Sequence, residues 1–381
     1  MRIIKTTKDL AEFCNSLKDG EFAAVDTEFM REKTYWPILC LIQVAGIHEE
    51  AIIDPLADGI DLAPLLEILG DPKMVKVFHA ARQDLEIFYQ LMDAVPAPLF
   101  DSQIAAMACG FGDQVGYEPL MRSLLNAKID KGSRFTDWSR RPLTDAQLHY
   151  ALSDVTHLRE AYPILLKSLE EKKRVHWVQE EVDALYDPAQ YFVEPAEAWR
   201  RLKTRNVKQS EIATLMKLAE WREREAQKRD TPRNRIMKDD GIFELSRVRP
   251  KDKDDLARAR SIPKGFERSG AANGILAAVK AAQEVPKDRL PKIERTDKAK
   301  PPPDVVDLLK VLLKRQCEHY GVAPKLIANS TDLEAIALND AADVKALSGW
   351  RREIYGDQAI KLKHGQLALK LKGGAVELVE T

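Results

Sequence analysis

Asp26 and Glu28 are candidates for chemistry because they interrupt an apolar run, residues 22–29, that is otherwise typical of a buried strand. Residues i and i+2 of a strand point to the same side, so the two carboxylates project together while Thr27 points away. Two like charges at the end of a hydrophobic strand are costly unless a cation lies between them. Hard divalent cations prefer carboxylate oxygens, so the pair predicts a metal site. The alternative is a strand that runs out into a solvated turn.

Two further stretches could complete such a site. Asp84 falls in the first turn of an amphipathic helix expected at residues 82–92, where a carboxylate is favourable even without a metal. Asp154 follows Tyr150 by four residues, a spacing that brings both side chains to one face of a helix. Four carboxylates can hold two divalent ions, Mg²⁺ or Mn²⁺. Such a pair clamps the attacking and leaving oxygens of a phosphodiester displacement.

Tyr150 and its neighbour His149 are the two candidates for acting on the attacking water. An unperturbed tyrosine has a pKa of about 10, so Tyr150 is expected to orient the water rather than to deprotonate it. A neutral His149, five residues before Asp154, could act as a base. Helix geometry favours Tyr150, because four residues turn about 40° past a full circle whereas five turn about 140°.

Taken together, three segments resemble the exonuclease motifs of the DEDD superfamily, in the subgroup with tyrosine in the third motif, and most of all those of the bacterial ribonuclease D family. They are DTEF at residues 26–29 with its continuation to residue 37, HAARQDLEIF at 79–88 and YALSD at 150–154. The run DWSRRPL at 137–143 is similar to the segment before the third motif in that family. Residues 211–285 resemble a helicase-and-RNase-D C-terminal (HRDC) domain, and residues 303–372 resemble a second, more diverged copy.

The resemblance implies a ribonuclease H-like α/β exonuclease domain, with a mixed sheet flanked by helices, followed by two all-α HRDC-like domains. It implies a metal-dependent 3′→5′ exoribonuclease that trims structured RNA, such as tRNA precursors and single-stranded 3′ ends, and releases 5′-mononucleotides. The implied ligands of two divalent ions are Asp26, Glu28, Asp84 and Asp154. These four and Tyr150 are the implied catalytic residues.

Weaker candidates for RNA contacts lie near the motifs and in the basic part of the chain. They are Phe29, Met30, Gln43, His79, Arg222, Arg233 and Arg235. The first two could stack on the terminal base or wedge beside it, with core packing as the alternative. The amide and the imidazole could reach ribose or phosphate, although interior polar groups are ordinarily satisfied within the protein. The arginines could contact phosphates without reading the base sequence.

The hydrophobic pattern predicts the elements that position these residues. A helix at 7–18 would have Thr7 as its N-cap, and strands at 22–29, 38–45 and 51–54 are close enough to favour antiparallel hairpins. Residues 144–147 match a capping box, which sets the register of the helix that carries the third motif. The expected domains are an exonuclease domain at 1–170, a connecting segment at 171–206, a helical domain at 207–286, a linker at 287–302 and a second helical domain at 303–375.

Composition restricts the class of protein. With 45% hydrophobic and 31% charged residues and no long apolar run or secretory signal, the chain is expected to be a globular protein of the cytoplasm, without a membrane partner. The four cysteines form no C-x-x-C pair, so neither a zinc site nor a disulfide framework is expected. Acidic residues outnumber Lys and Arg by 17 to 9 in residues 1–100, whereas Lys and Arg outnumber acidic residues by 12 to 5 in residues 200–236. This separation of acidic and basic regions suits an enzyme that binds an anion through metal ions in one region and through arginines in another.

Two alternative functions remain open from the sequence. One is a DNA exonuclease of the proofreading type, because a two-metal core does not itself separate ribose from deoxyribose. The other is a non-catalytic RNA-binding scaffold that has kept the fold. A helicase with its own ATPase is disfavoured, since the chain has no G-x-x-x-x-G-K-[ST] phosphate loop. A monomer is expected.

Overall fold

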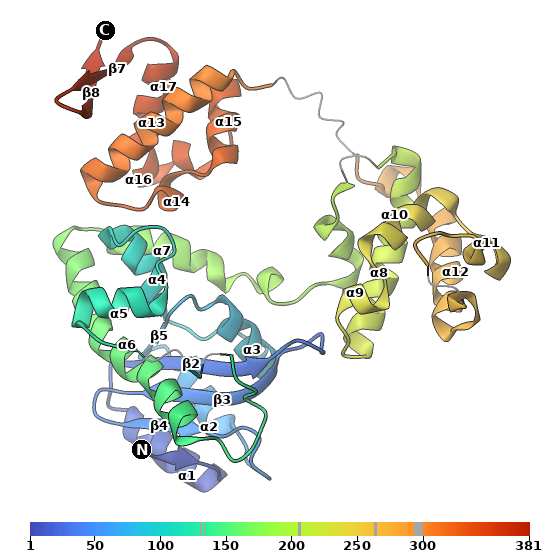
Figure 1. Cartoon of the computed structure of the whole chain (residues 1–381), viewed down its shortest axis with the longest axis horizontal. Helices are drawn as coiled ribbons and strands as arrows, with labels where there is room; N and C mark the ends of the chain where they lie inside the picture. Colours follow the sequence, from blue (N-terminus) through green and yellow to red (C-terminus); the bar gives the residue numbers. More distant parts are fainter. Residues whose placement is uncertain (130–131, 134, 205–206, 263–264, 293–299) are drawn as a thin grey trace. The chain divides into compact units, whose positions relative to one another are not determined.

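The computed structural model describes residues 1–381 except 130–131, 134, 205–206, 263–264 and 293–299, and most of its helices and strands are labelled in Figure 1. The chain forms two compact units. The first comprises Met1–Glu28, Cys40–Asp187 and Lys298–Thr381, and the second comprises Phe29–Leu39 and Pro188–Asp297. Each unit is therefore built from segments that are separate in the sequence. Part of the linker expected at 287–302 lies outside the described residues.

A six-stranded sheet in the order β1-β4-β3-β2-β5-β6 forms the centre of the first unit. Its strands are β1 (Ile3–Ile4), β2 (Phe22–Met30), β3 (Ile38–Ala45), β4 (Glu50–Ile53), β5 (Val75–Phe78) and β6 (Leu99–Asp101). The expected antiparallel pairing is confirmed for β3 and β4. By contrast, β1 pairs with β4, β2 with β5 and β5 with β6 in parallel, so the sheet is mixed, as the family resemblance implied. The pair β2–β5 is parallel because a helix lies in the connection between them, as parallel neighbours require.

Seven α-helices accompany the sheet in the described part of residues 1–187. They are α1 (Thr7–Leu17), α2 (Ala63–Gly70), α3 (Arg82–Met92), α4 (Ser102–Cys109), α5 (Tyr117–Leu125), α6 (Asp145–Glu171) and α7 (Val175–Asp183). The long helix α6 packs against β4 and β5, and α4 and α5 pack against α6 (Figure 1). The expected N-cap of α1 is wrong by one residue, because the side chain of Thr6, not Thr7, accepts a hydrogen bond from the amide of Asp9 at 3.2 Å.

The C-terminal part of the first unit is helical but ends in a hairpin. Its elements are α13 (Pro303–Tyr320), α14 (Pro324–Ile327), α15 (Ser330–Leu338), α16 (Gly349–Arg351), α17 (Asp357–Lys363), β7 (Leu367–Lys372) and β8 (Ala375–Glu380). The strands β7 and β8 pair antiparallel, so the expectation of an all-α second domain to residue 375 is wrong. Alternating apolar residues such as Leu367, Leu369 and Leu371 place every second side chain on one side of the hairpin.

Close backbone contacts join α4 to the C-terminal helices within this unit. The amide of Ala323 donates to the carbonyl of Met107 at 3.0 Å, and Arg174 donates to the carbonyls of Tyr320 and Gly321. Gly110, which follows α4, has φ of +97°, and a Cβ there would lie 2.8 Å from the carbonyl oxygen of Gly321. Only glycine suits both the left-handed backbone and this approach.

The second unit is a bundle of short helices around one core. Its helices are α8 (Ile212–Lys228), α9 (Arg233–Ile236), α10 (Asp239–Val248), α11 (Lys253–Ala257) and α12 (Gly270–Gln283). Fully buried side chains from four of these helices meet in the core, among them Leu215, Leu218, Ile242, Leu256 and Ile275. Trp221 packs closely on α12, since a Cβ at Gly274 would lie 2.3 Å from its Nε1 atom.

The segment that follows β2 belongs to this helical unit. Tyr35 is 7% exposed, and its hydroxyl donates to the buried carboxylate of Glu223 on α8. Arg233 also donates to Glu223, at 2.9 Å, and its guanidinium lies over the ring of Tyr35. The carboxylate of Asp230 accepts hydrogen bonds from the amides of Tyr35 and Trp36 at 3.0 and 2.9 Å. The continuation of the first motif is thus anchored on the helical domain by buried polar contacts.

Candidate active site

β2 presents the first two candidate ligands, as the period of a strand requires. Its apolar residues 23–25 are buried, whereas Asp26 and Glu28 are half-buried. One carboxylate oxygen from each of Asp26, Glu28 and Asp154 can be chosen so that the three lie within 4.8 Å of one another. Oxygen ligands of Ca²⁺ or Mg²⁺ lie at about 2.0–2.6 Å from the ion, and so within about 5 Å of one another. The group therefore fits a divalent cation.

Asp84 lies next to this group without being part of it. It is 7% exposed in the first turn of α3, and its Oδ1 accepts a 2.5 Å hydrogen bond from Thr27 Oγ1. The carboxylate of Asp101 accepts hydrogen bonds from the amides of Ala80 and Ala81 at 3.1 and 2.8 Å, which fixes the turn that leads into α3. Neither the support from Thr27 nor that from Asp101 was expected from the sequence. Asp101 could have been found, because an aspartate between a strand and a helix is a typical N-cap.

The register of α6 follows the capping box. The side chain of Thr144 accepts from the amide of Gln147 at 3.3 Å, and Gln147 Oε1 accepts from the amide of Thr144 at 3.0 Å, so this expectation is confirmed. In this register His149 is exposed and Tyr150 is half-buried. The ring of Tyr150 lies 6.1 Å from that of Trp138, centroid to centroid. Of the two candidates for acting on the water, Tyr150 is the one packed into the protein.

The segment before α6 is fixed to the sheet by Arg141. Its guanidinium donates to both carboxylate oxygens of Asp54, which follows β4, at 2.8 and 2.6 Å. It also donates to the carbonyl of Cys40 on β3 at 2.7 Å and to that of Trp138 at 2.8 Å. Burial alone would raise the pKa of Asp54, but the hydrogen bonds and charge of Arg141 outweigh it and hold that pKa below its usual value. Arg141 therefore fixes the segment that precedes the third motif against β3 and the end of β4.

Tyr117, at the start of α5, contacts residues of both the second and the third motif. This role was not expected from the sequence. The hydroxyl of Tyr117 donates to the backbone carbonyls of Ser153, at 3.1 Å, and Asp154. Its ring meets that of His79 edge to face, with centroids 5.4 Å apart. Burial, and then the charges of Asp154 and Asp26, raise the pKa of Tyr117 well above its usual value, so it remains a hydrogen-bond donor. No local pattern marks this role, because it depends on where α5 and α6 meet.

The electrostatics of the carboxylates favour a bound cation. Burial, and then the charge of Asp154, raise the pKa of Asp26 well above its usual value. Burial, and then the charge of Asp26, raise the pKa of Asp84 well above its usual value, against the hydrogen bond from Thr27. Carboxyl groups in this situation ionise readily only when positive charge enters the site. The donor set thus suits divalent metal ions.

The polar candidates for RNA contact have interior positions. Gln43 is fully buried on β3, and neither polar atom of its amide has a hydrogen-bond partner among the described residues. It presents no surface to a nucleic acid, so a direct contact is not available to it in this structure. Nδ1 of His79 lies 2.9 Å from Ser102 Oγ, and burial lowers its pKa. Phe29 and Met30, at the end of β2, are half-buried.

The three arginine candidates have different positions in the helical unit. Arg222 is 3% exposed and donates to the carbonyl of Met237 at 3.0 Å and to Asp239 at 2.7 Å. Arg233 is directed to the buried Glu223. Arg235 is exposed and donates a 3.3 Å hydrogen bond to the carbonyl of Glu32. The charge of Arg222 therefore stabilises the domain, and Arg235 is the one presented at its surface.

Comparisons with known proteins agree with this site. Residues 1–170 match the 3′-5′ exonuclease family model, and residues 211–279 match the HRDC domain model. A ribonuclease D of Gluconacetobacter diazotrophicus is 47% identical over 378 residues, which are 99% of this chain and 96% of that relative. The chain belongs to the ribonuclease D family. A ribonuclease D of Nitrobacter hamburgensis is likewise 47% identical, over 380 residues and the full length of both chains.

A solved structure extends the agreement to the whole fold. The crystal structure of Escherichia coli RNase D, described as an exoribonuclease involved in structured RNA processing, matches with a TM-score of 0.83 at 29% identity, over 96% of this chain and 98% of that one. This member of the ribonuclease D family is therefore a 3′→5′ exoribonuclease with a mixed-sheet exonuclease domain followed by an HRDC domain. Among the described residues, no helix is both long and apolar enough to cross a bilayer.

Proposed function

We propose that this ribonuclease D family member trims the 3′ ends of structured RNA, such as tRNA precursors with single-stranded 3′ extensions, and releases 5′-mononucleotides with the help of two divalent ions, Mg²⁺ or Mn²⁺. The observation that carries the proposal is the convergence of Asp26, Glu28 and Asp154, with Asp84 beside them. When bound, two such ions supply a water of lowered pKa and neutralise charge on the leaving oxygen. The relatives named ribonuclease D support RNA as the substrate.

Each catalytic residue has one role in this proposal. The carboxylates of Asp26, Glu28, Asp84 and Asp154 would together hold the two ions. Thr27 keeps the carboxylate of Asp84 directed to the site through its hydrogen bond. Tyr117 and the capping box fix the part of α6 that carries the third motif.

Tyr150 orients the attacking water, because it is the half-buried member of the pair at the start of α6. Its hydroxyl can both donate and accept a hydrogen bond, as a group that orients a water requires. Phe29 and Met30 follow the ligands Asp26 and Glu28 on β2 and contact the terminal base of the RNA.

The C-terminal helices of residues 303–363 form a second, diverged HRDC-like domain in this proposal. Their buried contacts to α4 and α7 support a role in stabilising the exonuclease domain. The enzyme acts as a monomer in the cytoplasm, where its four buried cysteines remain reduced.

The test uses purified full-length protein with a tRNA that carries a short 3′ extension and a DNA strand of matched sequence, each with Mg²⁺ and with EDTA. The expected result is stepwise release of 5′-mononucleotides from the RNA with Mg²⁺ and no release with EDTA. The Asp26→Asn variant is the control for a contaminating nuclease. Faster degradation of the DNA strand would favour a DNA exonuclease, and RNA binding without release would favour a non-catalytic scaffold.

A further inference from the structure

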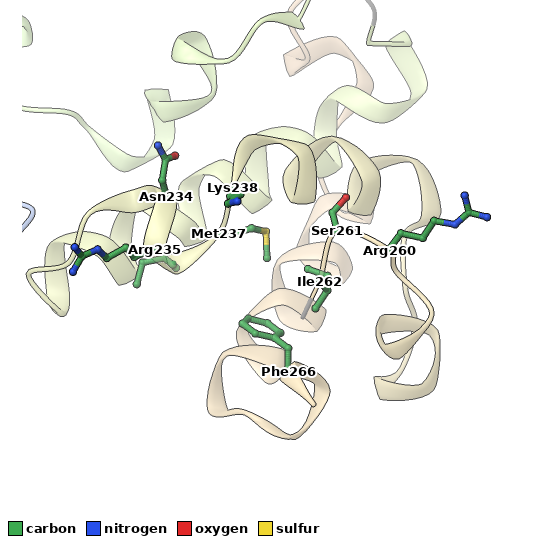
Figure 2. Close-up of a pocket in the computed structure, with 9 residues that line it drawn as sticks. Asn234, Arg235, Met237, Lys238, Arg260, Ser261, Ile262 and Phe266 are labelled. Carbon is green, nitrogen blue, oxygen red and sulfur yellow. The ribbon is translucent and has the colours of Figure 1, made fainter. Parts of the chain in front are cut away.

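A cavity of about 530 Å³ lies in the first HRDC domain, away from the carboxylate motifs in the sequence (Figure 2). It is formed by α9, by the segment that joins α9 to α10, by residues 260–262 and by the 3₁₀ turn Phe266–Arg268. Its volume is within the range of about 300–1,000 Å³ that is typical of pockets for small ligands. Among its lining residues are two that belong to the sequence run PRNR, Asn234 and Arg235.

The cavity combines an apolar floor with a cationic rim. The side chains of Met237, Ile262 and Phe266 gather at its centre, whereas Arg235 and Arg260 extend on opposite sides (Figure 2). Met237 and Ile262 are 6% and 9% exposed, so the floor is part of the domain core. Lys238, Asn234 and Ser261, all exposed, add a cation, an amide and a hydroxyl to the lining.

Two contacts hold the walls in place. The carboxylate of Glu244 on α10 accepts hydrogen bonds from the amides of Arg260 and Ser261 at 2.8 and 2.6 Å, which fixes the backbone of one wall. On the other wall, Arg233 is directed inward to Glu223, so that the next two residues of the short helix α9 face outward. The cavity is therefore built by the fold rather than by loose surface side chains.

We propose that this cavity binds one unpaired nucleotide of the RNA substrate, upstream of the 3′ end that is cleaved. The proposal rests on the proposed function and extends it from the cleavage site to the helical domain. A nucleobase is flat and apolar on its faces and polar at its edge, and it would pack on Phe266 and Met237 with its edge near Ser261. The phosphates on its two sides would meet the cations on the two sides of the rim.

The arrangement of charge favours a nucleotide within a strand. Arg235 and Arg260 lie on opposite sides of the floor, which suits a chain that enters with one phosphate and leaves with another. A base in a duplex is stacked and paired, so it cannot enter without being extruded. The pocket would therefore prefer single-stranded RNA, and it would read the presence of a base more than its identity.

The test measures RNA binding by the full chain in the Asp26→Asn background, in EDTA, by fluorescence anisotropy. The probes are a labelled single-stranded oligoribonucleotide and a strand of equal length whose bases are removed except in the last three nucleotides. The variants are Arg260→Gln, at an exposed residue, and Phe266→Leu, in which the side chain stays apolar. Arg258→Gln is the matched control, because Arg258 is exposed and does not line the cavity.

Arg260→Gln is expected to weaken binding of the intact strand about tenfold and to lower the slope of log K against log salt by about 0.7, the value for one phosphate contact in single strands. The parent protein should bind the strand without bases more weakly than the intact strand. The Phe266→Leu variant should bind the two strands with equal affinity. Arg258→Gln should leave affinity and slope unchanged. Thermal unfolding of each variant separates a lost contact from a lost fold.

Equal affinities of all variants for both strands would overturn the pocket proposal, even if the enzyme degrades RNA. Failure of the protein with native Asp26 to release nucleotides would overturn the proposed function, whatever the binding data show. An effect of Arg258→Gln as large as that of Arg260→Gln would show general attraction of RNA to a basic surface, and would also overturn the pocket proposal.

Discussion

The indole rings of Trp177 and Trp350 stack with their centroids 4.0 Å apart and their planes 9° from parallel. Trp177 lies on α7, in a stretch that we expected to be only a connecting segment, and Trp350 lies on α16. Both rings are buried, at 8% and 4% exposed. Around them Arg351 donates to the carboxylates of Glu180, at 2.8 Å, and Glu181. The C-terminal helices are therefore part of the folded first unit and not an independent appendage.

Trp350→Ala should destabilise the protein, because it removes a buried ring and leaves Trp177 without its partner. Replacement of a buried Trp by Ala costs about 3–5 kcal/mol. Urea unfolding followed by circular dichroism measures the change. Leu371→Ala, at a side chain that is 76% exposed, is the control and should alter stability by less than about 0.5 kcal/mol. Equal stabilities of the parent and the Trp350→Ala variant would show that the C-terminal helices do not support the exonuclease domain.

Asp54→Asn should destabilise the protein by about 1–3 kcal/mol at pH 7, since Arg141 loses a charged partner that is largely buried. The pKa of Asp54 is lower in the folded protein than in the unfolded chain. The contribution of Asp54 to the free energy of unfolding is therefore complete above the pKa of the unfolded chain, about 3.9. It is lost as the pH falls through the lower pKa of the folded protein. The stabilities of the parent and the variant should differ by a constant amount from pH 5 to 8 and converge below about pH 4.

Thermal unfolding across this pH range measures the effect. Asp58→Asn provides the matched control, because Asp58 lies four residues further along the chain and is exposed. A difference between the parent and Asp54→Asn that persists unchanged to pH 2 would mean that the variant acts through packing and not through the charge of Asp54.

Asp26→Asn should abolish turnover and strongly reduce binding of Mg²⁺, because it removes one of three carboxylates whose oxygens lie within 4.8 Å. RNA binding by the helical domain should remain nearly unchanged. Calorimetric titration with Mg²⁺ or Mn²⁺ measures the metal sites without any need for activity. Asp19→Asn, at an exposed position of the same domain, should behave like the parent. Wild-type turnover of Asp26→Asn in Mg²⁺ would refute the metal assignment.

Tyr150→Phe removes one hydroxyl and keeps the ring that packs near Trp138, so the fold should be nearly unaffected. Positioned proton-transfer groups contribute about 10²–10⁴-fold in rate, and we expect a loss near the lower limit because Tyr150 only orients the water. His149→Ala should change turnover by less than about threefold, since His149 is exposed and about 100° away from Tyr150 around the helix. Single-turnover rates of both variants at pH 7 to 9 decide between the two residues. Loss of turnover in His149→Ala with an active Tyr150→Phe would reverse the assignment.

Local patterns in the sequence determined the elements of the site. The two-residue period of a strand placed Asp26 and Glu28 on one side of β2, and the capping box set the register in which Tyr150 is half-buried and His149 exposed. These features depend on backbone geometry over a few residues, and such geometry follows directly from residue type and spacing. The three motifs likewise carried the resemblance to the ribonuclease D family, which the comparisons confirm.

The tertiary structure alone decided which groups meet. The proximity of Asp154 to Asp26 depends on how α6 packs on a sheet whose strands pair across long connections. The hydroxyl of Tyr117 reaches the carbonyl of Asp154 only because α5 packs against α6. A charge pattern likewise cannot distinguish Arg222, which is buried on Asp239, from Arg235, which is exposed. The environment of a side chain depends on the surfaces that fold against it, and residues far away in the sequence supply those surfaces.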